Sequence, residues 1–193
     1  MGKPMQGINL EFKARMRDEK RVRAALESLR PRVAGTDHQI DTYFNTPTGR
    51  LKLRQGNIEN SLIFYQRENS ARVRPSKVLF CKFSDPARVP TLRKVLTAAL
   101  GVAAVVEKVR EIYFVDDIKI HLDCVPGLGK FLEVEAYVKK GNLRHGRKQA
   151  EQMKEMFGVL PGDILSHSYS DLIVERRGKR PPERRRPRGL PIA

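Results

Sequence analysis

The 193-residue sequence has only two cysteines, and it lacks any long apolar run. Cys81 and Cys124 have no metal-ligand spacing, and we expect them to be buried thiols in a reducing compartment. The longest apolar runs fall far short of the roughly 20 residues that a membrane span needs. Residues 1–7 also lack the apolar core of a signal peptide. These absences predict a cytoplasmic protein without a membrane span.

Positive charge is abundant and unevenly placed. The formal net charge is +16, and residues 175–193 contain eight Lys/Arg against two Glu. The rest of the chain is still strongly basic, which implies an anionic partner: nucleic acid, an acidic protein or a phosphorylated small molecule. The Pro-rich composition of 175–193 predicts a disordered tail. A solvated end is the default interpretation of this tail, and a nuclear address or a nucleic-acid tether are the alternatives.

Alternation of apolar and polar residues predicts about eight short strands, mostly antiparallel, and hence a sandwich or a barrel. A helical period and capping residues predict several helices between them. We expect one mostly β domain of the α+β type over residues 8–174, between a short extension at 1–7 and the tail at 175–193. The strands are expected at 9–16, 38–44, 50–54, 60–67, 78–83, 105–115 and in a hairpin within 118–138; helices at 18–30, 91–100, 143–157 and 166–174; and a basic loop at 68–75.

The predicted strands carry clustered charges on one face. Glu133 and Glu135, two residues apart, share a strand face and therefore repel each other. One interpretation makes these faces the solvated outside of a one-sided sheet. The other closes the sheet into a barrel whose polar interior holds a charged ligand. A polyphosphate with Mg²⁺ or Mn²⁺ would satisfy both signs of charge in that interior: Glu11, Asp123, Glu133 and Glu135 against Lys13, Lys52, Arg54, Arg67, Lys108 and Arg110.

Several motifs, in order, resemble the CYTH family, the triphosphate tunnel metalloenzymes that include class IV adenylate cyclases and thiamine triphosphatases. The resemblance covers roughly residues 8–174 and is strongest to the class IV adenylate cyclase branch. It rests on Glu11-Phe-Lys-Ala-Arg15, Asp41-Thr-Tyr-Phe44 with Gly49-Arg-Leu-Lys-Leu-Arg54, Lys108-Val-Arg110, His121-Leu-Asp123, Phe131-Leu-Glu-Val-Glu135 and Ser168-Tyr-Ser-Asp-Leu172.

This resemblance implies an eight-stranded antiparallel closed barrel with flanking helices that binds ATP, thiamine triphosphate or inorganic triphosphate together with Mg²⁺ or Mn²⁺. Glu11, Glu133 and Glu135 would be catalytic and, with Asp123, would hold the metal. The triphosphate would be bound by seven basic residues: Lys13, Lys52, Arg54, Arg67, Lys82, Lys108 and Arg110.

One position departs from the family pattern. In the family motif Glu-x-Glu-x-Lys, the position of the first Glu is occupied in this sequence by Asn9. The amide of Asn9 offers an oxygen to a metal, but it carries no charge and cannot act as a base. We expect His121 to be a satisfied strand histidine rather than a proton carrier, and Asp171 to cap the last helix. A triphosphate phosphohydrolase is the favoured function. The alternatives are a class IV adenylate cyclase, a non-catalytic triphosphate sensor and a nucleic-acid-associated protein.

Overall fold

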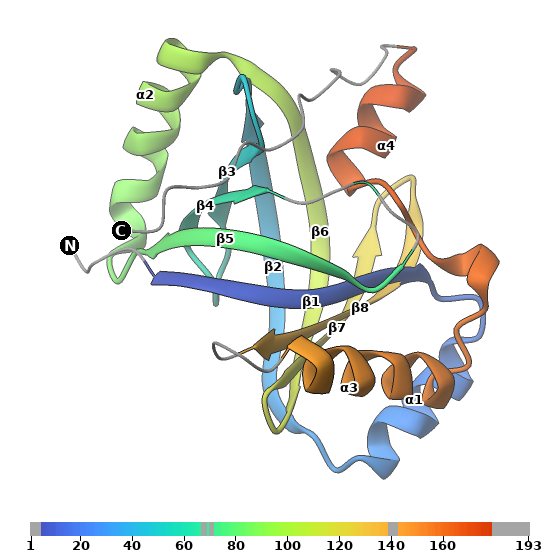
Figure 1. The fold of residues 1–193 in the computed structure, drawn as a ribbon. Coiled ribbons are helices and arrows are strands. Elements are labelled where there is room, and N and C mark those ends of the chain that lie inside the picture. Colours follow the sequence, from blue (N-terminus) through green and yellow to red (C-terminus); the bar gives the residue numbers. More distant parts are fainter. Residues whose placement is uncertain (1–4, 67–68, 70–71, 139–142, 179–193) are drawn as a thin grey trace.

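Eight antiparallel strands form a sheet that closes on itself in the computed structural model (Figure 1). The structure describes residues 5–66, 69, 72–138 and 143–178, so the predicted tail from 179 onward lies outside the described residues. Around the ring the strands follow the order β1-β5-β4-β3-β2-β6-β7-β8, and β8 pairs again with β1. The strands are β1 (Met5–Arg15), β2 (Arg32–Phe44), β3 (Arg50–Gln55), β4 (Ser61–Gln66), β5 (Arg74–Lys82), β6 (Val102–Val115), β7 (Ile118–Val125) and β8 (Gly129–Val138).

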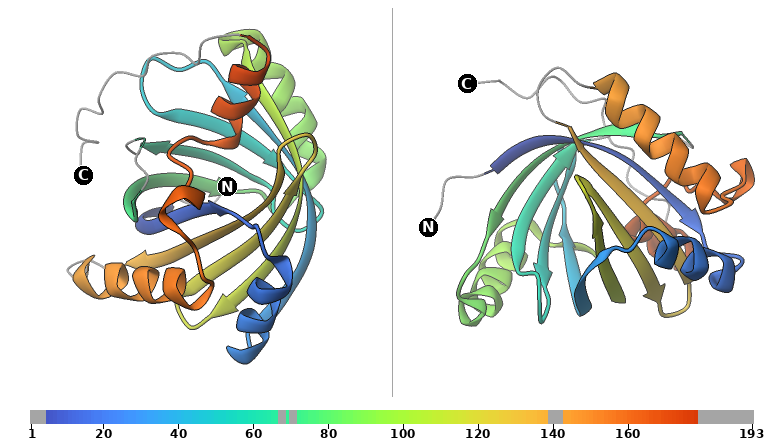
Figure 2. Two further views of the ribbon diagram at one scale, coloured as in Figure 1. Left: turned by 90° about the vertical axis from the view of Figure 1, so that its right-hand side faces the viewer. Right: turned by 90° about the horizontal axis from the view of Figure 1, so that it is seen from below.

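The described residues also form four α-helices around the ring of strands: α1 (Glu19–Ser28), α2 (Val89–Leu100), α3 (Leu143–Met156) and α4 (Tyr169–Arg176), with short 3₁₀ turns at Pro86–Arg88 and Pro161–Asp163 (Figures 1 and 2). The carboxylate of Asp18 caps α1 by accepting a hydrogen bond from the Arg21 backbone. Gly101, with a φ of 68°, ends α2 in a conformation that glycine adopts freely. None of the described helices is long and apolar enough to cross a membrane.

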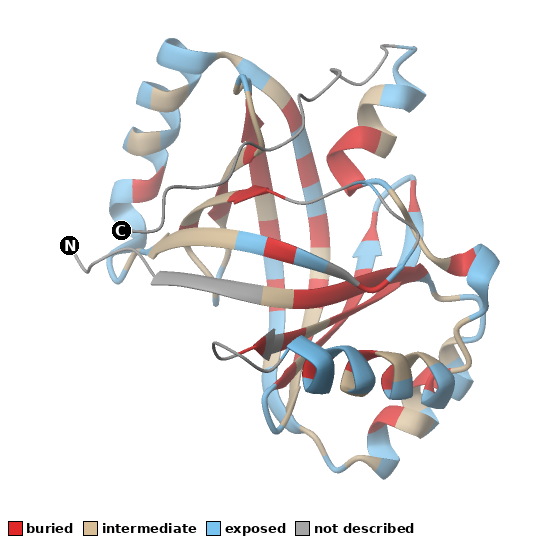
Figure 3. Cartoon of the chain, in the orientation of Figure 1, coloured by how far each residue is buried: buried red, intermediate tan, exposed pale blue. Residues whose placement is uncertain are grey.

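The main apolar core lies on the outer face of the barrel rather than inside it. Leu10, Phe12, Ile120, Leu132 and Val134 point outward from β1, β7 and β8 and are covered by apolar residues of α1 and α3. A second cluster joins the outer faces of β2 and β3 to α2. Figure 3 shows burial concentrated in the strands, while the helices expose much of their surface. With the outer faces taken by helices, the charged faces are left to the barrel interior.

The closed barrel with flanking helices confirms the fold expected from the sequence. Four strands begin earlier than expected: β1 at Met5 instead of residue 9, β6 at Val102 instead of residue 105, β2 at Arg32 instead of residue 38, and β5 at Arg74, inside the predicted loop. In β2 and β5 a partner strand supplies backbone pairing where the side-chain pattern gives no signal, as in Arg32 opposite Phe114 and Pro75 opposite Leu10. The expectation of two buried thiols is wrong, because Cys124 is exposed at the end of β7 and Cys81 is only partly buried.

Candidate functional site

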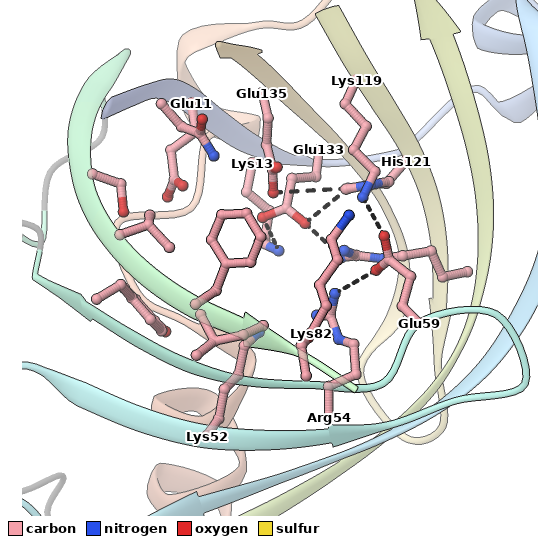
Figure 4. A pocket seen from close by; sticks show the side chains of 18 of the residues that line it. Glu11, Lys13, Lys52, Arg54, Glu59, Lys82, Lys119, His121, Glu133 and Glu135 are labelled. Carbon is pink, nitrogen blue, oxygen red and sulfur yellow. Dashed lines mark hydrogen bonds and ion pairs between the residues drawn. The ribbon is translucent and has the colours of Figure 1, made fainter. Parts of the chain in front are cut away.

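The barrel encloses a cavity of about 590 Å³ (Figure 4). Strand alternation turns charged side chains from all parts of the ring into it, as the polar-interior interpretation requires. The carboxylates of Glu11 and Glu135 lie across the cavity from Lys52 and Arg54. Nine of the residues predicted for the site line this one cavity: Glu11, Lys13, Lys52, Arg54, Lys82, Lys108, Arg110, Glu133 and Glu135.

Two other predicted residues are placed differently. Asp123 is completely buried and does not line the cavity; it lies behind Arg110, whose guanidinium donates to both carboxylate oxygens at 2.6 Å. In this position Asp123 orients a basic side chain of the wall. Arg67 lies outside the described residues.

The basic wall is organised by Asp41, a fully buried carboxylate of β2. Lys52 and Lys108 donate to it at 3.0 and 2.8 Å, and Arg54 donates twice, at 2.8 and 3.0 Å. Burial opposes ionisation of Asp41, yet the charges of Arg54, Lys108 and Lys52 prevail and hold its pKa well below the ordinary range. One carboxylate thus fixes three basic side chains that would otherwise repel one another, and all three also face the cavity. Burial lowers the pKa of Lys108 well below its ordinary value, and Asp41 opposes this shift.

A second carboxylate links the basic wall to a lysine of β7. Glu59, in the connection between β3 and β4, accepts from Arg54 at 2.8 Å and from Lys119 of β7 at 2.5 Å. Burial would raise the pKa of Glu59, but these two cations lower it strongly. Asp37 holds the connection in turn, because its carboxylate accepts from the backbone N–H groups of Ile58 and Glu59.

On the acidic wall, Glu133 is fully paired. Lys13 lies 2.7 Å from one of its oxygens and Arg110 lies 2.5 Å from the other. Burial opposes ionisation here too, but Lys13 and Arg110 keep the pKa of Glu133 well below its ordinary value. Glu133 is therefore an anion with two fixed counter-charges.

Glu135 is in the opposite situation, although it is only two residues away. It lies directly across the strand pair from Glu11 of β1 and beside Glu133. Burial and the negative charge of Glu133 raise the pKa of Glu135, Glu11 adds to this effect, and Lys119 only partly offsets it. The neighbouring basic side chains thus do not neutralise the negative charge that the sequence pattern gathers around Glu135.

His121 completes this wall from β7. Its side chain is 1% exposed, and its Nδ1 atom lies 3.4 Å from Glu133 and 3.9 Å from Glu135. Its Nε2 atom has no hydrogen-bond partner in the described part of the chain. Burial and the charge of Arg110 lower the pKa of His121 to about 3. The expectation of a satisfied strand histidine is wrong at Nε2: the ring is buried but incompletely paired.

The donor set of this wall fits a divalent cation. His121, Glu133 and Glu135 each offer one ligand atom, and these atoms all lie within 4.8 Å of one another. Carboxylate oxygens suit Mg²⁺ and Mn²⁺, and imidazole suits transition metals. A cation here would also offset the excess negative charge at Glu135. The residues present therefore fit the metal that the sequence resemblance implies.

The other end of the barrel interior is filled by an apolar cluster from several strands and from α4, including Tyr43, Tyr65 and Phe131. Tyr169, the first residue of α4, stacks on Phe131 at 4.9 Å between ring centroids and donates its hydroxyl to Asp123 at 2.8 Å. Its ring lies 3.8 Å from the Lys13 ammonium. The predicted cap is confirmed: Asp171 and Ser168 form a capping box, and Asp171 also accepts from Arg50.

Four residues of the site were missed by sequence reasoning. Asp41 shares a strand face with Asp37 and Gln39, so alternation could have pointed it inward. Lys119 likewise shares a face with His121. Glu59 belongs to a connection and Tyr169 to a helix start, so no strand period could have placed either in the cavity.

Comparisons with known proteins agree with this geometry. A family model described as the CYTH domain matches residues 7–169. A protein of Methanocaldococcus jannaschii named "putative adenylate cyclase" is 27% identical over 178 residues, which cover 86% of this chain and 98% of the relative.

Two solved structures share the fold. A protein of Pyrococcus horikoshii has a TM-score of 0.71 at 24% identity, with 85% of this chain and 98% of that chain covered. A Vibrio parahaemolyticus protein, whose description carries the same cyclase wording, has a TM-score of 0.70 at 17% identity, with coverages of 90% and 99%.

Proposed function

Because this chain belongs to the CYTH domain family, we propose that it is a metal-dependent enzyme that cleaves a triphosphate-bearing substrate inside the barrel, as a phosphohydrolase. The observation that carries this proposal is the division of one cavity into a basic wall fixed by Asp41 and an acidic wall that fits a divalent cation. A metal–triphosphate complex carries both charges that these walls would bind.

In this proposal the chain's own side chains bind and orient the phosphates. Lys52, Arg54 and Lys108 are held in place by Asp41 before any ligand arrives, so little reorganisation is needed when phosphate oxygens approach. Charge-assisted hydrogen bonds from Lys and Arg are the usual means of binding phosphate. Phosphoryl transfer depends mainly on such positioning and on charge stabilisation.

Glu11, Glu133 and Glu135 are the proposed metal-holding residues, and His121 and Asp123 flank them. When bound, Mg²⁺ or Mn²⁺ would supply neutralisation of phosphate charge and activation of water.

The cavity also has an apolar part, which supports an organic substrate over inorganic triphosphate. Ile58, Phe80, Phe83 and Phe114 line it together with the charged groups. Aromatic and aliphatic side chains of this kind bind a base or another ring.

A class IV-type adenylate cyclase is the second candidate. It is supported by the curated relative, which aligns along nearly its whole length and whose name assigns it that activity. In that reaction the ribose 3′-hydroxyl attacks the α-phosphorus of ATP, its proton is lost, and pyrophosphate leaves. Compared with hydrolysis, this reaction also requires a site that holds the ribose 3′-hydroxyl in line with the α-phosphorus and the leaving pyrophosphate.

Product analysis separates these candidates. The purified protein is incubated with ATP, GTP, thiamine triphosphate or tripolyphosphate in the presence of Mg²⁺ or Mn²⁺, and the products are resolved by chromatography. Orthophosphate identifies a hydrolase; cyclic nucleotide with pyrophosphate identifies a cyclase. Binding of a triphosphate without turnover would overturn the enzyme proposal in favour of a sensor.

A matched pair of variants ties any turnover to the cavity. Lys52→Met removes a cation of the basic wall, whereas Lys94→Met removes an exposed cation of α2. We expect the first variant to lower turnover at least tenfold and the second to leave it unchanged, since a charge-assisted contact is worth roughly 1.5–3 kcal/mol. Equal rates in the two variants would place the activity elsewhere.

A further inference from the structure

The acidic wall contains a nitrogen donor at the point where its carboxylates are least compensated. His121 of β7 lies directly opposite Glu133 of β8, and Lys119 lies opposite Glu135. Figure 4 shows the imidazole turned toward both carboxylates. The wall therefore offers oxygen and nitrogen donors side by side.

The pairing of His121 is unusual for a buried side chain. A good hydrogen bond to a carboxylate spans about 2.7–3.2 Å, whereas Nδ1 is 3.4 Å from Glu133 and 3.9 Å from Glu135. Its Nε2 has no partner among the described residues. The nitrogen that faces the two carboxylates, Nδ1, is therefore farther from each of them than a good hydrogen bond, and an ion bound between the three groups would account for that spacing.

The donor spacing agrees with a shared cation. Ligand atoms about 2.0–2.2 Å from one metal ion are about 2.8 Å apart when adjacent and up to about 4.4 Å apart when opposite. The two distances from Nδ1 fall inside this interval.

Position 9 also affects the charge of this wall. Asn9 and Glu11 alternate inward from β1 and both line the cavity. The amide of Asn9 offers an oxygen but no negative charge, so Glu11 is the anionic donor of the two.

We propose that His121 is a metal ligand of this chain, acting with Glu133 and Glu135, and that it shifts the preference of the site from Mg²⁺ toward Mn²⁺ and Co²⁺. The inference rests on the proposed function and adds the kind of metal to it. Mg²⁺ prefers oxygen donors, whereas imidazole binds the later divalent metals more strongly. We therefore expect the preference of the site among divalent metals to depend on the His121 side chain.

Pulsed EPR of the full-length protein loaded with Mn²⁺ tests the ligand directly, without turnover. We expect ¹⁴N coupling from one histidine in the wild type and in His38→Asn, a control that alters an exposed histidine. The coupling should vanish in His121→Asn. Absence of coupling in Mn²⁺-loaded wild type, or its persistence in His121→Asn, would overturn the proposal.

Calorimetric titration tests the selectivity. We expect wild type to bind Mn²⁺ and Co²⁺ at least tenfold more tightly than Mg²⁺, and His121→Asn to lose on the order of tenfold in Mn²⁺ and Co²⁺ affinity with a much smaller change for Mg²⁺. Equal losses for all three metals, with thermal unfolding unchanged, would contradict a nitrogen ligand.

The outcome is separable from that of the proposed function. If His121→Asn and wild type both cleave a triphosphate with Mg²⁺ but neither shows nitrogen coupling, the enzyme proposal stands and the ligand proposal fails. If Mn²⁺ shows nitrogen coupling in wild type but no triphosphate is bound or cleaved, the ligand proposal stands and the enzyme proposal fails.

Discussion

The two carboxylates Asp41 and Glu135 face the same barrel interior in contrasting surroundings. Asp41 is fully buried and accepts hydrogen bonds from Lys52, Arg54 and Lys108. Glu135 lies beside Glu133 and opposite Glu11, and its pKa is raised by burial and by these negative neighbours. The protein thus supplies enough positive charge to neutralise the carboxylate of Asp41, but not enough to neutralise that of Glu135.

This difference distinguishes a carboxylate that stabilises the fold from one that we propose binds a ligand. A buried carboxylate with three cationic partners is stabilised within the fold, and it fixes those partners toward the cavity. Carboxylates held close together without enough counter-charge cost stability and persist where they serve a ligand. The basic wall is therefore complete in the protein alone, whereas the acidic wall is the part that we propose a cation completes.

The strongest test removes the centre of the basic wall. In Asp41→Asn the side chain keeps its size, but Lys52, Arg54 and Lys108 lose their common counter-charge. We expect the free energy of unfolding to fall by about 3–5 kcal/mol, the usual cost of leaving buried charge unpaired. Urea unfolding measures this loss, with Glu155→Gln on the exposed side of α3 as the control. A change below about 1 kcal/mol would mean that water already compensates these cations.

The acidic wall should respond in the opposite way. We expect Glu135→Gln to lower metal-dependent turnover by roughly 10²–10³-fold, while the free energy of unfolding stays within about 1 kcal/mol because a repulsive charge is removed. Glu133→Gln should lose both turnover and stability, since Lys13 would be left without its counter-charge and Arg110 would keep only Asp123. Steady-state rates and urea unfolding of the two variants are compared. Equal stability losses would remove the distinction between the two carboxylates.

Acid should weaken the basic wall specifically. The folded pKa of Asp41 lies well below that of an unfolded Asp, about 3.9. Below about pH 5 the unfolded chain therefore takes up a proton that the folded chain refuses, and stability falls as pH falls. We expect the free energy of unfolding of wild type to drop more steeply between pH 5 and pH 3 than that of Asp41→Asn. Parallel curves would show that other carboxylates account for the acid sensitivity.

The sequence predicted the site residues that lie on strands better than those that reach the cavity from connections and helices. A strand period of two placed Glu11, Glu133 and Glu135 on one set of faces, and the same period placed Lys52 and Arg54 on another. Period alone could not decide whether those faces pointed to solvent or to a closed interior. That choice depends on helices α1, α2 and α3 covering the other faces, which is a tertiary event.

Residues that reach the site from outside the strands were beyond this kind of prediction. Glu59 enters from a connection whose backbone is held by Asp37, a contact between residues 22 positions apart. Asp123 shows a different limit. Its strand face was inferred correctly, but only the coordinates reveal that Arg110 and Tyr169 take up its oxygens and keep it out of the cavity lining.

Tyr169 of α4 offers the finest test of the comparison, because its ring lies 3.8 Å from the Lys13 ammonium of the acidic wall and 5.9 Å from the Lys108 ammonium of the basic wall. Its hydroxyl donates to Asp123, which holds Arg110. Burial and the nearby Asp123 raise the pKa of Tyr169, so the hydroxyl remains a donor at neutral pH.

In Tyr169→Phe the ring stays and only that donor is lost. We expect a stability loss of about 1–3 kcal/mol, since a hydrogen bond to a charged group is removed. Turnover should fall less than in Glu135→Gln, because Arg110 keeps both of its bonds to Asp123. A loss of turnover as large as that of Glu135→Gln would instead give the phenol a direct part in the chemistry.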